Sequence, residues 1–252
     1  MAVADRIRTI NAYATLIANP LGTLTNTALV INPLPAVVDG TQHQLWFAEG
    51  PNGIVIDDDQ TTARGWAGAA NDDCTIQRRM VLSPMRGATL PVGAVVGARH
   101  APTTRVVAGA LASELWVTEM QNGCTVLILD WGGGSYSLFH IQPSQDNQFN
   151  WLGQKIIGLG DSAMAAYKNT WLKSEANTIV TNTGGALPQR YIMVQSMFEA
   201  SRGWVTQLLG VKQGGQFAFY RQRSRMLLGV VNILAERLVW TTWRWWVPWS
   251  SY

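Results

Sequence analysis

Hydrophobic positions near the start of the chain recur with the period of an α-helix. Successive apolar residues are separated by steps of three and four: Val3, Ile7, Ile10, Ala14 and Ile17. The pair Asn19-Pro20 ends this pattern, because proline removes a backbone donor and restricts the residue before it. The spacing predicts a helix over 3–17.

Beyond this segment the pattern changes to short apolar runs separated by clusters of Gly, Pro, Asn and Asp, which is typical of β-strands. The runs that predict strands are Ala28–Ile31, Gln44–Ala48, Gly53–Ile56, Arg79–Leu82, Val92–Gly97, Thr104–Gly109 and Ser113–Met120.

Two later segments show helical periodicity. Asp161 or Ser162 can cap a helix with the apolar residues Met164, Tyr167, Trp171 and Leu172. A second helix is expected from Ser224 to Trp240, with one apolar face made of Leu227, Val230, Val231, Leu234 and Leu238. With no repeat or linker in the chain, we expect one α+β domain over 1–252. Its centre would be a β-sandwich of mostly antiparallel strands flanked by helices, with the Trp-rich segment 240–252 packed on it.

Composition excludes a disordered chain. Of the 252 residues 47% are hydrophobic and only 14% are charged, whereas disorder requires low hydrophobicity and high charge. The two cysteines, Cys74 and Cys124, are too few for a disulfide framework and have no paired-ligand zinc spacing. We therefore expect a protein that works in a reducing compartment, without a metal or another cofactor.

No segment resembles a targeting signal. Asp5, Arg6 and Arg8 interrupt the N-terminal stretch, so a cleaved signal peptide is not expected. The longest apolar stretch, Met226–Trp240, is broken by polar and charged residues and is too short for a transmembrane segment.

Charge is concentrated near the C-terminus. The net charge is +3, and the segment from Arg221 onward holds five arginines and one acid, Glu236. Tryptophans follow these arginines instead of alternating with them: Trp240, Trp243, Trp245, Trp246 and Trp249. This order does not predict a nucleic-acid surface. It leaves two interpretations of the tail, packing over one end of the sandwich or contact with a membrane surface, since Trp favours membrane interfaces.

Three motifs suggest chemistry only weakly. Asp57-Asp58-Asp59 follows a strand without the spaced oxygen ligands of a cation site, and Gly132-Gly133-Gly134 lacks the Lys-Ser/Thr of a phosphate loop, so both predict turns. Asp72-Asp73-Cys74 could present the nucleophile of a papain-like amidase at a helix start. The residues after Cys74 are typical of a strand, however, and nearby carboxylates raise a thiol pKa, so a structural cysteine is expected.

Cys124 and His140 lie on two predicted strands, Val126–Trp131 and Ser135–Gln142, joined by the glycine turn. If Gly132–Gly134 is the loop, Trp131 faces Ser135, Cys124 opposes Gln142 and His140 opposes Val126. The cysteine and the histidine then lie on one face as diagonal neighbours, with Cβ atoms roughly 7–8 Å apart or somewhat less. A register slip of one residue would place them on opposite faces.

The residues before Cys124 could complete a catalytic site. Asn122-Gly123 predicts a tight turn that leaves the backbone N–H groups near Gly123 and Cys124 free to form an oxyanion hole. A three-residue loop, 121–123, would place Thr118 opposite Val126 on the face of His140, where it could orient the imidazole. A two-residue loop would turn Thr118 away, and the sequence leaves both loops open. Core packing of Cys124 and His140 is the alternative to a catalytic role.

Thr118-x5-Cys124, with Gly123 before the cysteine and His140 one hairpin later, resembles the Cys-His glutamine deamidases of the cytotoxic necrotizing factor type. This superfamily includes Burkholderia lethal factor and the chemoreceptor glutamine deamidase. The resemblance covers Thr118 to His140, and toxin members usually carry Ser-Gly-Cys where this chain has Asn122-Gly123-Cys124. It implies a β-sandwich with Cys and His on neighbouring strands and a Thr or a main-chain carbonyl that orients the His.

The resemblance also implies a function. The chain would be a bacterial effector or toxin that converts a target Gln to Glu through a thioester on Cys124, with transamidation as a side activity. It would leave the bacterial cytoplasm without a cleaved signal peptide and act in the host cytosol, on a small GTPase or a translation factor. Two other classes stay open: a non-catalytic protein that binds a membrane or a partner through its Arg/Trp-rich C-terminus, and a papain-like amidase that uses Cys74.

Overall fold

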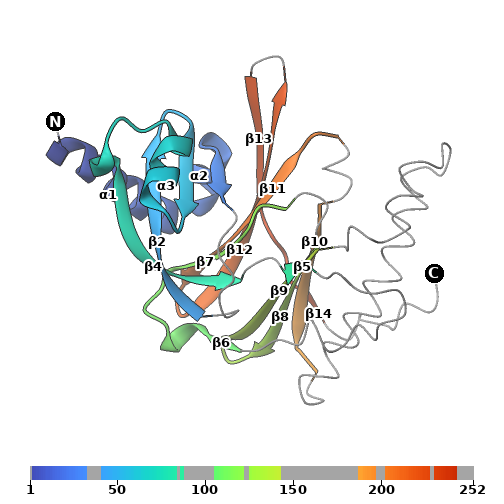
Figure 1. Cartoon of the computed structure of the whole chain (residues 1–252). Helices are drawn as coiled ribbons and strands as arrows, with labels where there is room; N and C mark the ends of the chain where they lie inside the picture. Colours follow the sequence, from blue (N-terminus) through green and yellow to red (C-terminus); the bar gives the residue numbers. More distant parts are fainter. Residues whose placement is uncertain are drawn as a thin grey trace.

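The computed structural model describes residues 2–32, 41–83, 86–87, 105–121, 125–142, 187–196, 202–227 and 230–242. In these residues the chain forms three α-helices and two β-sheets (Figure 1). The prediction of a β-rich chain with few helices is confirmed. The predicted strand Val92–Gly97 and the helix expected from Asp161 or Ser162 lie outside the described residues.

The N-terminal helix is longer than the sequence pattern predicts and is followed at once by a second helix. α1 covers Ala2–Ala18, and α2 covers Pro20–Asn26. Asn19 caps α2, because its side-chain oxygen accepts a hydrogen bond from the backbone N–H of Gly22 at 3.1 Å. Pro20 therefore ends one helix and also opens the next, since a helix tolerates proline in its first turn.

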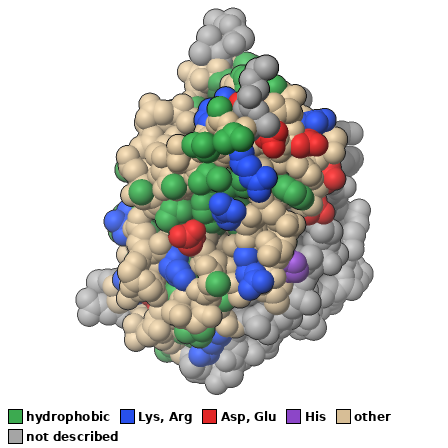
Figure 2. All heavy atoms as spheres, turned by 90° about the vertical axis from the view of Figure 1, so that its left-hand side faces the viewer, with side chains coloured by type: hydrophobic (Ala, Val, Ile, Leu, Met, Phe, Trp, Pro, Cys, Tyr) green, Lys and Arg blue, Asp and Glu red, His purple; other side chains and the backbone are tan. Residues whose placement is uncertain are grey.

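The apolar residues that predict α1 are not its buried face. Val3, Ile7 and Ile10 remain 74%, 51% and 39% exposed. On this side of the molecule hydrophobic side chains lie among basic ones (Figure 2). The helix instead buries Tyr13 and Leu16, with Tyr13 packed edge-on against Phe47 of the sheet. Because α1 is apolar on more than one side, its periodicity alone does not select the face that meets the core.

The larger sheet is mixed. Its spatial order is β1 (Leu29–Ile31), β3 (Gly53–Asp57), β2 (Thr41–Gly50), β4 (Thr75–Ser83), β7 (Leu115–Thr118), β11 (Val205–Gln213), β12 (Gln216–Leu227) and β13 (Val230–Arg237). The β1–β3 and β4–β7 pairs are parallel and the other pairs of this sheet are antiparallel.

The larger sheet curls until its first strand meets strands from its other half. The backbone N–H of Leu29 donates to Gln222 at 2.6 Å, and that of Ile31 donates to Gln207 at 3.3 Å. Side-chain amides of β12 and β11 thus satisfy backbone donors of β1, which pairs only with β3 among the described strands. The inside of the curl is an apolar core to which α1 and α2 contribute Tyr13, Leu16 and Leu24.

α3 (Gln60–Ala67) covers the opposite face of β2 and β3. Ala63 and Ala67 pack there against Ala48 and Val55. β3 is buried at every position, as expected for a strand covered on both faces.

The smaller sheet has the order β14 (Thr241–Thr242), β10 (Arg190–Gln195), β8 (Thr125–Gly132), β9 (Ser135–Gln142) and β5 (Arg86–Gly87), and β6 (Val106–Val107) also pairs with β9. Only the β5–β9 pair is parallel among these described strands. Two short 3₁₀ helices, Asp72–Cys74 and Ala108–Ala110, complete the described elements.

The two sheets share a second apolar core. Phe217 and Phe219 of the larger sheet meet Tyr136 of β9, with ring centroids 6.1 and 6.2 Å apart. The same two rings pack against Trp116 of β7 at 5.3 and 5.9 Å. The smaller sheet adds Val126, Ile128, Leu138, Ile192 and Val194 to this core. Such tilted aromatic pairs each stabilise a core by about 0.5–1.5 kcal/mol beyond the area that they bury.

The prediction of a helix from Ser224 to Trp240 is wrong. This segment completes β12 and forms β13, an antiparallel hairpin in which Leu227 pairs with Val230 and Arg221 with Glu236. The strand is favoured because β11 pairs with one edge of β12 from Gln216 to Ser224, which leaves the other edge free for β13. β13 pairs with that edge at every residue from Val230 to Arg237. Three residues of the predicted apolar helix face, Leu227, Val231 and Leu234, remain 47–48% exposed, whereas Leu238 packs against the inter-sheet core.

The first tryptophan of the C-terminal segment packs on the inter-sheet core. Trp240 stacks on Tyr136 with ring centroids 5.9 Å apart and meets Phe219 edge-on at 5.8 Å. The remaining tryptophans lie outside the described residues. Among the described helices, none has the length and apolar character needed to cross a membrane.

A pair of glycine substitutions tests the inter-sheet packing. A Cβ added at Gly210 would lie 2.8 Å from the Phe219 ring and 3.0 Å from Cβ of Trp116, so Gly210→Ala should lower the free energy of unfolding by about 1–3 kcal/mol. Gly65→Ala, in exposed α3 with no atom near the new methyl, should raise it by about 0.5–1 kcal/mol. Urea unfolding followed by tryptophan fluorescence measures both changes. Equal effects of the two substitutions would contradict the packing described.

Candidate active site

The hairpin of β8 and β9 has the predicted register over most of its length. His140 pairs directly with Val126, and Thr125 pairs with Ile141. Near the turn the prediction is wrong by one residue, because Gly132, not Trp131, pairs with Ser135. The extra residue is accommodated as a β-bulge, and the three turn glycines all have positive φ, a conformation that suits glycine.

His140 points into the space between the two sheets. Directly paired residues of an antiparallel ladder lie on the same face, and Val126, the partner of His140, belongs to the inter-sheet core. His140 is only 4% exposed. β8 and β9 are both interior strands of the smaller sheet, as their two apolar faces predict.

Thr118 reaches His140 by a different route from the predicted one. It ends β7 in the larger sheet, whereas the strand neighbours of Val126 are His140 and Val194. The pairing of Thr118 with Val126, which a three-residue loop would have given and which the sequence left open, is therefore not formed. The contact itself exists, because the Thr118 hydroxyl lies 2.7 Å from Nδ1 of His140 across the gap between the sheets.

The hydrogen bonds of Thr118 determine the tautomer of His140. The Thr118 hydroxyl also lies 2.6 Å from the backbone carbonyl of Ser83, which can only accept. The single hydroxyl proton is therefore donated to Ser83, and Thr118 must accept the proton of Nδ1–H. Nε2 of His140 is then the unprotonated nitrogen with an available lone pair.

Burial keeps this imidazole neutral. Loss of solvation lowers the pKa of His140 to about 3. Nε2 is buried and has no hydrogen-bond partner among the described residues. An unprotonated, oriented and unpartnered ring nitrogen can take a proton from a nucleophile placed beside it.

Ser83 holds this arrangement from the neighbouring strand. It pairs with Thr118 in the parallel β4–β7 ladder, and its hydroxyl accepts a hydrogen bond from Nε1 of Trp116 at 3.0 Å. Ser83 contributes through its backbone carbonyl, so its residue type gives no signal in the sequence.

Gly123 and Cys124, the predicted oxyanion and nucleophile residues, lie outside the described residues, as does Asn122. The described residues on either side of them are fixed by strand contacts. Gln121 forms a bridge with Thr206 of β11, and Thr125 pairs with Ile141 and Gln195. Cys124 is thus covalently joined to the strand that carries Val126, the direct partner of His140.

Cys74 is in a structural environment. It is fully buried at the end of a 3₁₀ turn, and β4 begins at the next residue, as the sequence predicts. Arg8 donates to its sulfur at 3.5 Å, and the sulfur lies 3.8 Å from the side-chain oxygen of Asn71. The helix that would expose Cys74 in a papain-like site is absent from the described residues 71–83.

The aspartate cluster serves local structure. Asp57 accepts hydrogen bonds from Asn32 at 2.5 Å and from the backbone of Asp59 at 2.8 Å. Asp59 caps α3 through the N–H and hydroxyl of Thr62, and these bonds lower the pKa of Asp59. No group of His, Cys, Asp and Glu side chains within the described ranges could hold a metal ion.

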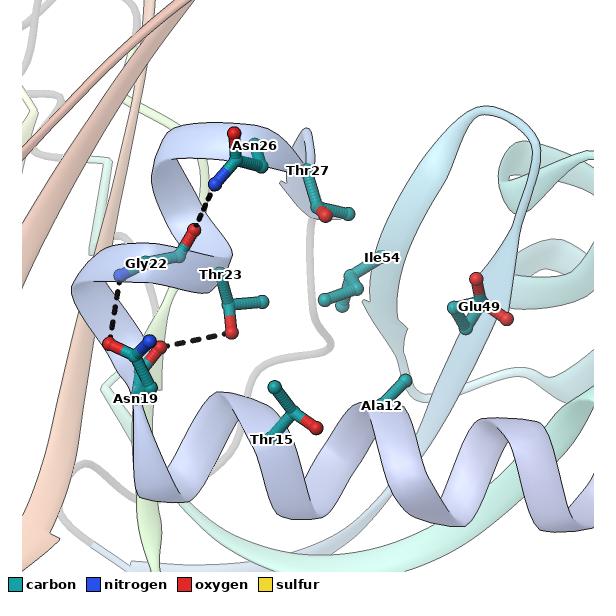
Figure 3. Close-up of a pocket in the computed structure, with 9 residues that line it drawn as sticks. All are labelled: Ala12, Thr15, Asn19, Gly22, Thr23, Asn26, Thr27, Glu49 and Ile54. Carbon is teal, nitrogen blue, oxygen red and sulfur yellow. Dashed lines mark hydrogen bonds between the residues drawn. The ribbon is translucent and has the colours of Figure 1, made fainter.

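A surface cleft of about 350 Å³ lies elsewhere, between α1, α2 and the β2–β3 hairpin (Figure 3). Thr15, Thr23 and Asn26 line it, and each donates its side-chain hydrogen to a backbone carbonyl of its own helix. None of the predicted catalytic residues lines this cleft.

Comparisons with known proteins add little to these contacts. No protein-family model matches the chain, and no curated protein matches its sequence. Among solved structures, the chain is similar to the C-terminal domain of CNFy from Yersinia pseudotuberculosis, with a TM-score of 0.43 and 8% identity. The match covers 91% of this chain and 98% of that chain. Such a low score does not support the transfer of a fold or an activity, so any chemistry must be inferred from this chain's own residues.

The burial of His140 predicts a pH-dependent stability. Below pH 6.5 the unfolded chain binds a proton at His140, whereas the folded chain does not do so until the pH approaches 3. Stability is therefore complete above pH 6.5 and is lost as the pH falls. Relative to His140→Gln, which cannot titrate, the wild-type free energy of unfolding should fall by about 2 kcal/mol from pH 7 to pH 5. Urea unfolding at both pH values measures this, and parallel changes in the two proteins would contradict a buried neutral imidazole.

Proposed function

We propose that the chain is a protein glutamine deamidase in which Cys124 is the nucleophile, His140 the general base and acid, and Thr118 the residue that orients His140. The observation that carries this proposal is the Thr118–His140 contact, which leaves Nε2 unprotonated, buried and without a partner among the described residues. The register of β8 and β9 supports it, because Cys124 precedes a strand whose Val126 is paired with His140.

The reaction begins with His140 neutral, since burial lowers its pKa to about 3. Nε2 accepts the thiol proton as the sulfur of Cys124 attacks the side-chain carbonyl carbon of the substrate glutamine. This differs from a resting thiolate–imidazolium pair, because the imidazolium forms only during the attack. Backbone N–H groups near Gly123 and Cys124 would hold the oxyanion of the tetrahedral intermediate.

The intermediate collapses when His140 returns the proton to the leaving nitrogen. Ammonia departs, and the acyl group remains on Cys124 as a thioester. His140 then takes a proton from water, the hydroxide attacks the thioester carbonyl, and the proton regenerates the Cys124 thiol. The product is glutamate, which carries a negative charge where the substrate was neutral. An amine in place of water would give a transamidated product.

The biological setting belongs to the same proposal. The motif from Thr118 to His140 supports a toxin-like effector, delivered from a bacterium without a cleaved signal peptide. Its substrate would be a glutamine of a host small GTPase or translation factor in the host cytosol. The two sheets and their shared core would be the layers of a β-sandwich flanked by α1, α2 and α3, with 1–252 forming one catalytic domain.

Three variants test the activity. Cys124→Ser and His140→Ala should each lower deamidation by at least about 10³-fold, because one removes the thiol and the other the proton carrier. Cys74→Ser is the matched control and should remain active, since Cys74 is buried between Arg8 and Asn71. Ammonia release and the mass change of one glutamine in candidate host proteins measure activity. A dead Cys74→Ser beside an active Cys124→Ser would assign the nucleophile to Cys74.

The orienting role of Thr118 has its own test. Thr118→Ala removes the acceptor of Nδ1–H and should lower kcat about 10- to 100-fold with little change in KM, because the imidazole loses its fixed orientation. Thr118→Ser keeps the hydroxyl and should restore most of the loss. Steady-state ammonia release measures both constants. Equal rates for the alanine and serine variants would show that the hydroxyl does not orient His140.

A further inference from the structure

Gln121, three residues after Thr118, and Thr206 of β11 have fully buried polar side chains. Gln121 and Thr206 are both 0% exposed, and neither the amide nitrogen and oxygen of Gln121 nor the hydroxyl of Thr206 has a partner among the described residues. Buried polar groups in native proteins are nearly always hydrogen-bonded, and exceptions concentrate where a ligand or a reaction completes the set.

The strand pairing places these groups on the face of His140. Thr206 lies on the same side of β11 as Leu208, which belongs to the inter-sheet core. Gln121 and Thr206 form a reciprocal backbone pair, with N–O distances of 2.8 and 3.2 Å, so their side chains share that side. Gln121 and Thr206 of the larger sheet and His140 of the smaller sheet therefore face the same inter-sheet space.

One extra residue in the chain brings Gln121 to this position. The β7–β11 register pairs Val117 with Leu209, and its continuation would place Met120 opposite Thr206. The backbone of Met120 bonds instead to the carbonyl of Ile31 at 3.2 Å, and Gln121 takes the place beside Thr206. Such bulges commonly re-aim a side chain next to an active site.

Other buried glutamines of the same sheet show what a structural role looks like. The amide oxygen of Gln207 accepts from Ile31, and Gln222 accepts from Leu29 while donating to the carbonyls of Leu24 and Thr27. They face the inside of the curl, on the opposite side of the sheet from Gln121. Gln121 has equal burial and no such partner.

We propose that Gln121, with Thr206 beside it, is the subsite that recognises the side-chain carboxamide of the substrate. A carboxamide has one acceptor oxygen and an NH₂ donor, and Gln121 offers the complementary donor and acceptor. Gln121 precedes Cys124, the proposed nucleophile, by three residues, so the subsite and the nucleophile belong to the same short segment of the chain. This inference rests on the proposed deamidase function for its place in the reaction.

The same subsite explains release of the product. A glutamate carboxylate only accepts hydrogen bonds, so it cannot donate to the amide oxygen of Gln121, and its charge would lose hydration in this buried space. Buried polar groups left unpaired by the wrong ligand discriminate strongly between similar ligands. Glutamine should therefore bind and glutamate should leave.

Gln121→Leu tests the subsite, with Gln207→Leu as the matched control. Gln121→Leu should lower kcat/KM for the blocked peptide acetyl-Gly-Gln-Gly-amide about 10- to 100-fold, the loss expected for two neutral hydrogen bonds. Its Tm should not fall, because the substitution removes unpartnered buried groups. Gln207→Leu should lower Tm and leave kcat/KM unchanged. Gln121→Glu keeps the shape and should also lose activity, which separates hydrogen bonding from packing.

Binding in the Cys124→Ala background separates this inference from the proposed function. Calorimetry should show tighter binding of acetyl-Gly-Gln-Gly-amide than of acetyl-Gly-Glu-Gly-amide, and Gln121→Leu should abolish the difference. Ammonia release that depends on Cys124 and His140 but not on Gln121 would overturn the subsite and leave the deamidase intact. Selective binding through Gln121 in the Cys124→Ala variant would support the subsite. If the chain with Cys124 released no ammonia, the deamidase would be overturned. Equal binding of the two peptides would overturn the subsite.

Discussion

The packing of the two sheets against each other is the constraint on which the candidate site depends. Phe217 and Phe219 of the larger sheet pack against Tyr136 of the smaller one and against Trp116 of β7. Gly210 leaves the space that Phe219 and Trp116 fill. This core fixes the separation of β7 from β9. Only at that separation does the Thr118 hydroxyl lie 2.7 Å from Nδ1 of His140.

The apolar core also makes the polar end of the interface chemically useful. Water is excluded around His140, so its imidazole stays neutral, and hydrogen bonds in such surroundings are stronger than in water. The same exclusion leaves Gln121 and Thr206 unpaired at a cost of about 1–3 kcal/mol for each unsatisfied group. Aromatic packing elsewhere in the interface offsets this cost. Functional sites in proteins commonly lower stability in this way while the surrounding structure compensates.

Backbone contacts carry much of this organisation. Ser83 orients Thr118 through its carbonyl, Met120 bonds to Ile31, and Gln121 is held by the backbone of Thr206. Such contacts make the position of the site depend on strand register and little on residue type. Ser83 therefore gives no sequence motif for its contact with Thr118, because any residue at this position has the same carbonyl.

The chain's local patterns predicted β1 to β4, β7 to β9 and the N-terminal helix, but not the strands from β10 onward. They also predicted the face shared by Val126 and His140, because a hairpin register depends on neighbouring residues and a glycine turn. They did not determine the partner of Thr118, since β7 pairs with β4 and β11 and joins the other sheet. The segment from Ser224 to Arg237 fits a helical period and also a strand, and pairing with β12 decides for the strand. Contacts between residues far apart in the sequence made these choices. They assigned each strand to a sheet, buried Tyr13 in place of Ile7, and left Nε2 of His140 and the side chain of Gln121 buried without partners among the described residues.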